Sequence, residues 1–329
     1  MAYRTAGSSN GRFGVYAWAV LGYNLLVILW GAVVRATGSG AGCGEHWPLC
    51  QDRLVPHAQQ IATLIEFSHR ASSGIDVLLV GALVVLAYRQ YGSGHPVRRY
   101  AAATGFFTLT EGLVGAALVL LGDVGTRVSA GRVAVLSAHL VNTFLLLAAL
   151  ALTAWAAGGD EPMAAATEPP RSRPRPYLLY FAGLLATVAI ALSGVIAALA
   201  DVLYPAKSLA QAVHWDISSN AAPLLHLRII HPLAAVLLGA YLVAMAGVTL
   251  RSGTTANARK MARRLISLVV FQCCLGVVNL LLLTPVLLQV LHLFAADLTW
   301  IAMVLLAAES FAGRLLPVPR VQRQLEPVQ

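Results

Sequence analysis

Long apolar stretches recur along this chain of 329 residues and constrain its fold more than any other feature. A helix needs about 20 apolar residues to cross the roughly 30 Å hydrocarbon core of a bilayer. Hydrophobic residues make up 58% of the chain and charged residues 11%, too few charges to cover a soluble globule. Strands of a β-barrel would alternate in polarity, and these stretches do not. We expect an all-α integral membrane protein with eight transmembrane helices, near residues 14–34, 62–88, 100–121, 132–157, 177–200, 223–250, 264–285 and 287–313.

Arginine and lysine collect in the connections on one side of these predicted helices. The opposite connections hold fewer bases, partly offset by acids such as Glu45, Asp52 and Asp123. Because basic connections stay on the cytoplasmic side, we expect both termini to be cytoplasmic. This topology accounts for the net charge of +9, which gives no reason to expect nucleic acid binding. The bases on that side are Arg4, Arg12, Arg89, Arg98, Arg99, Arg171, Arg173, Arg175, Arg251, Arg259, Lys260, Arg263, Arg264, Arg314, Arg320 and Arg323.

The chain divides into two halves of four predicted helices. Residues 158–176 are rich in Gly, Pro and Ala with clustered Arg, which predicts a flexible cytoplasmic linker between an N-terminal half, 1–157, and a C-terminal half, 177–329. A nearly constant offset indicates a tandem repeat, interpreted as two four-helix bundles related by pseudo-twofold symmetry. The offset is 162 positions from His69 to His231, 161 from Gly115 to Gly276, 163 from Gly31 to Gly194 and 153 from His139 to His292, where the preceding connection is shorter.

Four histidines lie a few residues inside apolar stretches that enter the membrane from the same side, so they share one depth. A lone histidine there is more often a hydrogen-bonded core residue, but four at matching depth favour a functional site. Imidazole is the usual axial ligand of heme iron, and two helices across a bundle can supply a pair. We expect one heme in each half, ligated by His69 and His139 in the first and by His231 and His292 in the second.

Charged residues accompany these histidines. Arg35, Arg70 and Arg228 lie near the outer helix ends, where a guanidinium can clamp heme propionates; the alternative is interfacial snorkelling. Glu66 precedes His69 by three residues, on the same helical face, whereas Arg228 occupies the matching place in the other half. Glu66 is therefore a candidate for proton transfer beside the first heme, or else forms a salt bridge to Arg70 or Arg35.

The first outer connection contains Cys43 and Cys50, separated by six residues, and the second half has no such pair. On the oxidising side of a membrane these cysteines can close a small disulfide loop. The loop is either a structural staple or a redox-active pair that exchanges with an external carrier.

Several motifs in the first half carry a family resemblance. They are the glycine-rich run Gly31 to Gly40, the loop Cys43 to Cys50 with Trp47-Pro48, the run Arg53 to Pro56, and Glu66-Phe67-x-His69-Arg70. Together they closely resemble bacterial heme A synthase, and the similarity covers nearly the whole chain.

This resemblance implies oxidation of the C8 methyl of heme O to a formyl group, giving the heme A of terminal oxidases. The first half would hold heme O as substrate and heme A as product, and the second would hold a heme b that shuttles electrons. Glu66 would be the catalytic carboxylate, and Cys43 with Cys50 the disulfide of the first loop. A heme O synthase would be the donor, terminal oxidase assembly the acceptor, and the bacterial plasma membrane with its lipid the location. The sequence is also compatible with a homo-oligomer.

Two departures from that family matter. Some members carry another cysteine pair in the third outer loop, where residues 201–222 here contain none. Glu111 stands where the family usually has Gln, and its counterpart in the second half is Gln272. Glu111 is either a proton-path residue or a buried neutral acid, and Asp297 is a further intramembrane acid without an assigned role.

Two other functions compete with a synthase. A diheme b-type cytochrome that passes electrons from quinol to an outside acceptor explains the four histidines equally well. It does not explain why Glu66 and the cysteine pair occur only in the first half. A heme-carrying assembly factor without catalysis is the third possibility.

Overall fold

The computed structural model describes residues 7–57, 60–124, 129–158, 177–251 and 255–315. Over these ranges the chain is helical, and its one β pairing is an isolated bridge between Cys50 and Arg53. The predicted linker at 158–176 lies, apart from Gly158, outside the described residues. The elements are α1 (Gly7–Ala36), η1 (Ser39–Ala41), α2 (Ile61–Gln90), α3 (Pro96–Leu120), α4 (Ala130–Ala157), α5 (Tyr177–Leu203), α6 (Leu209–Ile217), α7 (Pro223–Arg228), α8 (Ile230–Arg251), α9 (Ala256–Leu281) and α10 (Val286–Leu315).

Among the described residues, eight spans are long and apolar enough to cross a membrane, which confirms the predicted number and the all-α fold class. The protein is therefore a multi-pass membrane protein. The sixth span combines α7 and α8, because the helix is interrupted at Ile229. The short helix α6 was not predicted; Ser208 caps it by accepting a hydrogen bond from the backbone N–H of Gln211 at 3.2 Å.

The seventh predicted helix, 264–285, is shifted toward the N-terminus in the structure. α9 already begins at Ala256, because its basic first turns continue the helix beyond the apolar stretch and their long side chains can reach water. It ends at Leu281, since Leu283 and Thr284 take positive φ values of 58° and 53° in the turn before α10.

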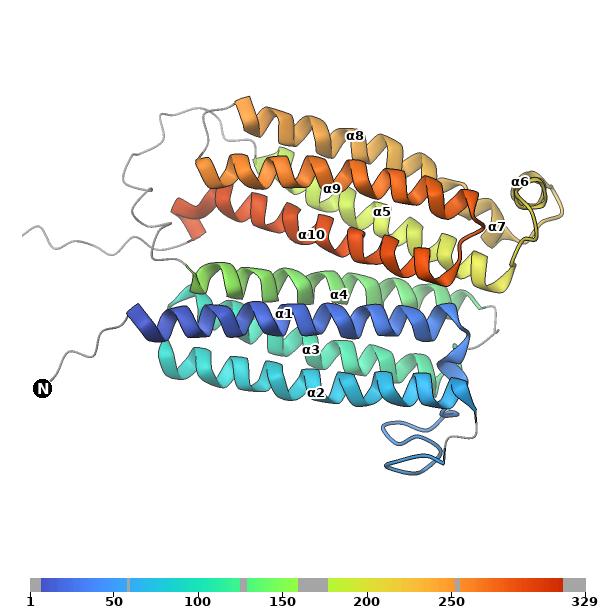
Figure 1. Cartoon of the computed structure of the whole chain (residues 1–329), viewed down its shortest axis with the longest axis horizontal. Coiled ribbons are helices and arrows are strands. Elements are labelled where there is room, and N and C mark those ends of the chain that lie inside the picture. Colours follow the sequence, from blue (N-terminus) through green and yellow to red (C-terminus); the bar gives the residue numbers. More distant parts are fainter. Residues whose placement is uncertain (1–6, 58–59, 125–128, 159–176, 252–254, 316–329) are drawn as a thin grey trace, which may run out of the picture.

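The helices form two layers (Figure 1). The first layer holds α1 to α4, and the second holds α5, α7, α8, α9 and α10. Helices α1 and α4 of the first layer pack against α10, and α4 also packs against α5. The loop after α1 and the helix α6 lie at the same end of the molecule, as expected for two connections on one side of a membrane.

The two layers share a hydrophobic core at this seam. Phe144 of α4 stacks on Trp300 of α10 with ring centroids 4.7 Å apart, and the Trp300 indole donates a hydrogen bond to the Phe144 carbonyl at 2.6 Å. Ile301 and Val304 of α10 also belong to the core of the first layer. A second indole, that of Trp155, donates to Glu309 across the seam at 2.9 Å. The halves are thus held at a fixed distance and orientation.

Candidate functional site

Three of the four predicted ligands lie directly against a glycine of a neighbouring helix. A Cβ added to Gly31 would lie 3.0 Å from Cε1 of His69, and one added to Gly194 would lie 3.0 Å from Cε1 of His231. Gly276 stands in the same relation to His292, also at 3.0 Å. At this distance an added Cβ would push the imidazole ring by a few tenths of an ångström, so the glycines leave the rings the positions that they occupy.

The second half brings its two histidines together. The ring centroids of His231 and His292 are 6.2 Å apart, with the rings at 87° to each other. Two imidazoles that ligate one metal ion from opposite sides at about 2 Å have centroids about 6 Å apart. Nδ1 of His231 lies 3.0 Å from the Ser193 hydroxyl, the kind of contact that orients a ligating histidine. The pair therefore fits an axially ligated heme.

In the first half His69 lies on α2 and His139 on α4, two helices of the first layer. Nδ1 of each ring is buried and accepts or donates no hydrogen bond within the structure, so both rings have free ligating capacity. Nδ1 of His139 lies 3.4 Å from Oε1 of Glu111, which is an ion-pair distance rather than a hydrogen bond. The assignment of His69 and His139 as a ligand pair for heme stays a prediction.

Glu111 is held by two neighbours on α4. The Asn142 amide donates to its Oε2 at 2.5 Å, and the Thr143 hydroxyl donates to its Oε1. Its counterpart Gln272 lies 3.3 Å from Nε2 of His292. Each half thus places a polar side chain from its third span beside the histidine of its fourth, but only the first half uses an acid.

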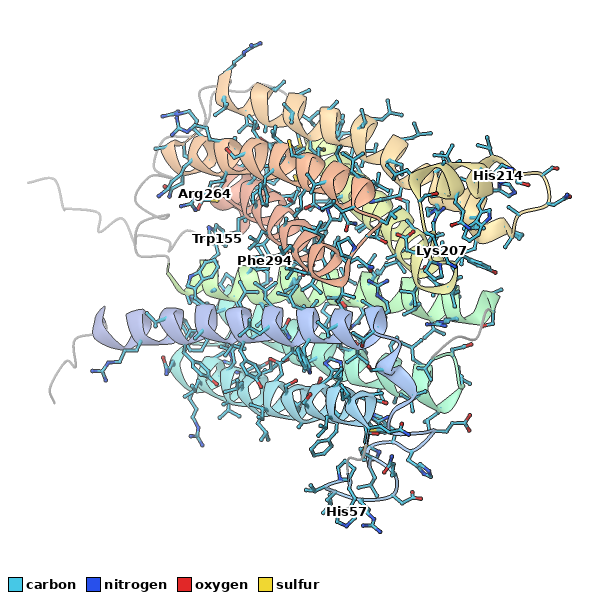
Figure 2. All side chains as sticks on the ribbon, turned by 45° about the vertical axis from the view of Figure 1, so that its right-hand side comes forward. His57, Trp155, Lys207, His214, Arg264 and Phe294 are labelled. Carbon is cyan, nitrogen blue, oxygen red and sulfur yellow. A yellow bond between two sulfur atoms is a disulfide. The ribbon has the colours of Figure 1, made fainter. Side chains whose placement is uncertain are left out.

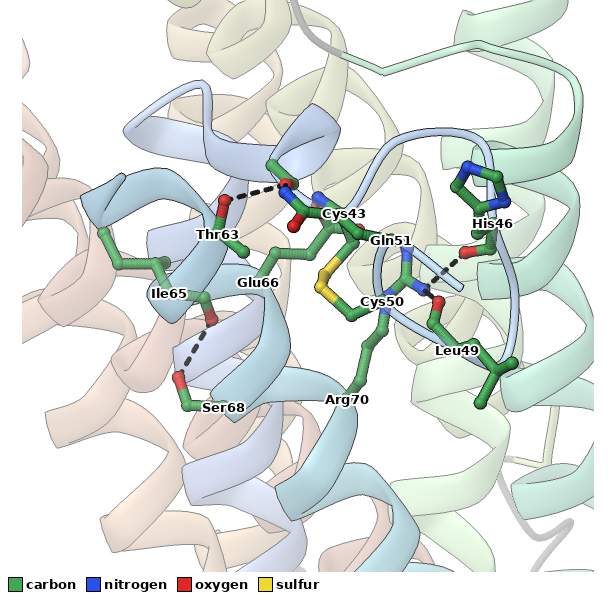
Figure 3. Close-up of a disulfide and its surroundings, with 11 residues drawn as sticks. Cys43, His46, Leu49, Cys50, Gln51, Thr63, Ile65, Glu66, Ser68 and Arg70 are labelled. Atoms are coloured by element: carbon green, nitrogen blue, oxygen red, sulfur yellow. Dashed lines mark hydrogen bonds and ion pairs between the residues drawn. A yellow bond between two sulfur atoms is a disulfide. The ribbon is translucent and has the colours of Figure 1, made fainter. Parts of the chain in front are cut away.

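The loop after α1 is fastened onto the start of α2 (Figure 3). Cys43 and Cys50 form a disulfide. Glu66, which is 3% exposed, accepts a hydrogen bond from the Cys43 backbone N–H at 2.7 Å and pairs with Arg70 at 2.5 Å. Gly42 lies so close to the backbone of Ala62 that a Cβ would stand 2.5 Å from it. The loop and the helix are thereby packed as one unit.

Arg70 also holds this loop. Its Nη1 donates to the backbone carbonyls of His46 at 2.6 Å and Leu49 at 2.7 Å (Figure 3). The predicted alternative of a salt bridge between Glu66 and Arg70 is therefore confirmed. Glu66 was predicted to transfer protons and Arg70 to bind heme propionates. In the structure both side chains form hydrogen bonds with the disulfide loop.

The other two arginines predicted to hold propionates differ from each other. Arg228 pairs with Asp201 at 2.9 Å and with Asp216 at 2.6 Å, so its guanidinium is already matched by two carboxylates. Nη1 of Arg35 is buried and has no hydrogen-bond partner. Of the three candidates, Arg35 has the most donor capacity left for an anion.

A set of buried polar side chains in the first half was missed in the sequence. Asn24 of α1 donates to Asp76 of α2 at 2.7 Å, and these residues are 3% and 4% exposed. The hydroxyls of Thr104 and Thr153 lie 3.5 Å apart deeper in the same bundle. The repeat offset could have revealed part of this set, because the second half has apolar residues at three of the matching places: Leu238 for Asp76, Leu265 for Thr104 and Leu306 for Thr153. Thr187, which is also polar, matches Asn24.

The fold defines a helical membrane protein with eight spans among the described residues. Each half carries two of the four predicted histidine ligands, and the N-terminal half has the more polar surroundings. The chain belongs to the cytochrome oxidase assembly protein family, whose model matches residues 14–304. It is 44% identical over 299 residues to proteins named protoheme IX farnesyltransferase from two strains of Thermus thermophilus, with 91% of this chain matched. It spans about half the length of those relatives, since the match covers 48% of each. Heme A synthases of Bacillus cereus and Bacillus anthracis are 40% identical over 100 residues, which is 30% of this chain and 32% of theirs.

Proposed function

We propose that this protein is a heme A synthase, which oxidises the C8 methyl of heme O to a formyl group. The observation that carries the proposal is the inequality of two otherwise matching histidine sites. In the second half the neutral side chains of Ser193 and Gln272 contact His231 and His292. In the first half the acid Glu111 lies beside His139, and a second acid, Glu66, one turn from His69, holds the disulfide loop. A site that only carries electrons needs no acid beside its histidines. A site that oxidises its heme needs groups that accept protons.

We assign the second pair to a heme b and the first pair to the substrate heme. Bound heme b would supply one-electron oxidation and reduction. His231 and His292 would hold it, with Ser193 orienting the ring of His231 through Nδ1. Gln272 lies 3.3 Å from Nε2 of His292, so ligation through that nitrogen would replace this contact. The stacked rings of Phe144 and Trp300 tie α4, which carries His139, to α10, which carries His292. This contact keeps the distance between the two sites constant, as electron transfer from one to the other requires.

In the first half we assign His69 and His139 to the substrate iron and Arg35 to its carboxylate groups. Glu111 stands at 3.4 Å from His139 and is oriented by Asn142, so it is placed to hold that imidazole in position. Glu66 fastens the disulfide loop to α2 through the Cys43 amide. Its catalytic role stays a prediction.

The farnesyltransferase name of the Thermus relatives suggests a different reaction on heme. Transfer from a prenyl diphosphate uses Mg²⁺ held by clustered carboxylates. The two aspartates closest in sequence, Asp201 and Asp216, are 15 positions apart and both pair with Arg228. In the part of the chain that the structure describes, no three metal-binding side chains form a cluster. We therefore base the proposal on the heme A synthase relatives.

Expression in a bacterial host that makes heme O but lacks its own synthase tests the proposal. We expect pigment extracts of the membranes to contain the mass of the formyl heme. Heme B and heme O alone, in membranes that contain folded protein, would instead favour the diheme cytochrome or the non-catalytic carrier. A second incubation, with heme B and farnesyl diphosphate, should give no heme O, and its formation would support the farnesyl transfer.

The cellular setting follows from the same proposal. We infer that the protein lies in the bacterial plasma membrane with both termini in the cytoplasm, receives heme O from a heme O synthase and delivers heme A to terminal oxidase assembly. The basic first turns of α9 lie at the end of the bundle where α1 begins, and α1 ends near Arg35 at the opposite end. The basic end is the one that we assign to the cytoplasm.

A further inference from the structure

A groove of about 550 Å³ lies across the seam between the two layers. Its walls come from α9 and α10 of the second layer and from Trp18 of α1 in the first. Figure 2 labels Arg264 at this end of α9, opposite the end that carries Lys207 and His214. The groove therefore opens at the basic end of the molecule.

The rim of the groove is cationic. Lys260, Arg263 and Arg264 are exposed and line it on the first turns of α9. Within the described ranges no carboxylate lies at ion-pair distance from any of them, and the one contact of the Arg264 guanidinium is the Met261 sulfur at 4.0 Å. Three positive charges at one place without a protein partner favour an anionic ligand.

The floor of the groove is apolar. Leu298, Ile301 and Leu305 of α10 line it beneath the bases, and Leu268 of α9 faces them. From Leu305 to Leu298 the helix rises about 10 Å, which is a substantial part of one leaflet. Trp18, which is 44% exposed, stands beside this wall; tryptophan favours such a position between headgroups and hydrocarbon.

We propose that this groove binds one anionic diacyl phospholipid. Its phosphate lies among Lys260, Arg263 and Arg264, and an acyl chain follows Leu298, Ile301 and Leu305. A soluble anion would use the rim alone and leave the apolar floor without a partner. Because Trp18 belongs to the first layer and the other walls to the second, the bound lipid also bridges the seam.

The test uses the full-length protein in nanodiscs of phosphatidylcholine with or without phosphatidylglycerol. After delipidation and native mass spectrometry, we expect one retained phosphatidylglycerol per chain and a thermal midpoint that rises only when this lipid is present. The triple variant Lys260→Gln, Arg263→Gln, Arg264→Gln should bind it on the order of a hundredfold more weakly. A matched triple variant at the same end, Arg89→Gln, Arg99→Gln, Arg251→Gln, removes equal charge away from the groove and should retain the lipid.

A variant that keeps every charge provides an independent check. Ser267 lines the groove and is exposed, so Ser267→Trp fills the space without entering the core. We expect it to lose the lipid as the triple variant does. The proposal is overturned if both variants retain phosphatidylglycerol like the wild type, if phosphatidylcholine is retained equally, or if inorganic phosphate displaces the lipid at millimolar concentration.

Discussion

The Glu66 carboxylate accepts a hydrogen bond from the backbone N–H of Cys43 at 2.7 Å, so one buried acid links the second transmembrane helix to the disulfide loop. Its other oxygen pairs with Arg70, which also holds two carbonyls of the same loop. Glu66, which has no acidic counterpart in the second half, thus holds the disulfide loop in place together with Arg70.

Replacing Glu66 should therefore separate heme binding from product formation. We expect Glu66→Ala to retain both hemes and to lower the ratio of heme A to heme O in pigment extracts at least about tenfold, because the loop loses its anchor and Arg70 its partner. Glu66→Gln can still accept from the Cys43 amide and should keep part of the activity. Glu45→Gln, an exposed acid in the same loop, is the control. Unchanged heme A output from Glu66→Ala would refute both roles.

The disulfide should be a support for this loop. The double variant Cys43→Ala, Cys50→Ala removes a constraint worth about 2–3 kcal/mol, while the Arg70 hydrogen bonds to the loop remain. We expect a lower thermal midpoint and a partial loss of heme A output, smaller than that of Glu66→Ala. A complete loss of output in a variant whose loop remains protected from proteolysis would favour the redox-active alternative.

The glycine beneath His292 should control heme binding in the second half. A Cβ at Gly276 would lie 3.0 Å from Cε1 of His292, so Gly276→Ala should push the imidazole by a few tenths of an ångström. We expect heme affinity at that site to fall about tenfold, measured as heme b per chain in the purified protein. Gly81→Ala, where a Cβ meets nothing within 4 Å, should leave the heme content unchanged. Equal heme content in both variants would contradict the assigned ligand.

Asp297 should lower the free energy of unfolding. It is fully buried, and neither carboxylate oxygen has a hydrogen-bond partner. Three and four residues further along α10, Trp300 and Ile301 enter the core of the first layer, so Asp297 lies on the same face. We expect Asp297→Leu to raise the free energy of unfolding by about 1–3 kcal/mol, seen as a higher thermal midpoint. Asp216→Leu removes a partner of Arg228 and should lower it.

The helices and the placement of the histidines were accessible from the sequence, because both depend on local properties. A run of about 20 apolar residues has few alternatives to a membrane span, and Glu66 and His69, three residues apart, keep their spacing in any helix. The start of α9 was missed because basic side chains that reach water let the helix continue beyond its apolar part. The short helix α6 was missed because it depends on its cap at Ser208 and has no long apolar stretch.

Partners across the bundle were not accessible in the same way. Glu66 pairs with Arg70 four residues further along the same helix, but the hydrogen bonds of both side chains to the disulfide loop, 21 to 24 positions away, were not visible in the sequence. The pair Asn24 and Asp76 joins residues 52 positions apart, so a contact pattern was needed to find it. Comparing the two halves could have indicated this site, because Asp76 in the first half matches the apolar residue Leu238 in the second.

The central claim is that the two histidine pairs hold different hemes and that only the first pair holds the substrate. Mass spectrometry of the heme retained by two purified variants tests it most directly, with heme O supplied in the host. The variant His231→Ala, His292→Ala should retain heme O that is not oxidised, and the variant His69→Ala, His139→Ala should retain heme B alone. If both variants retain the same heme, the two sites are equivalent and the account is wrong.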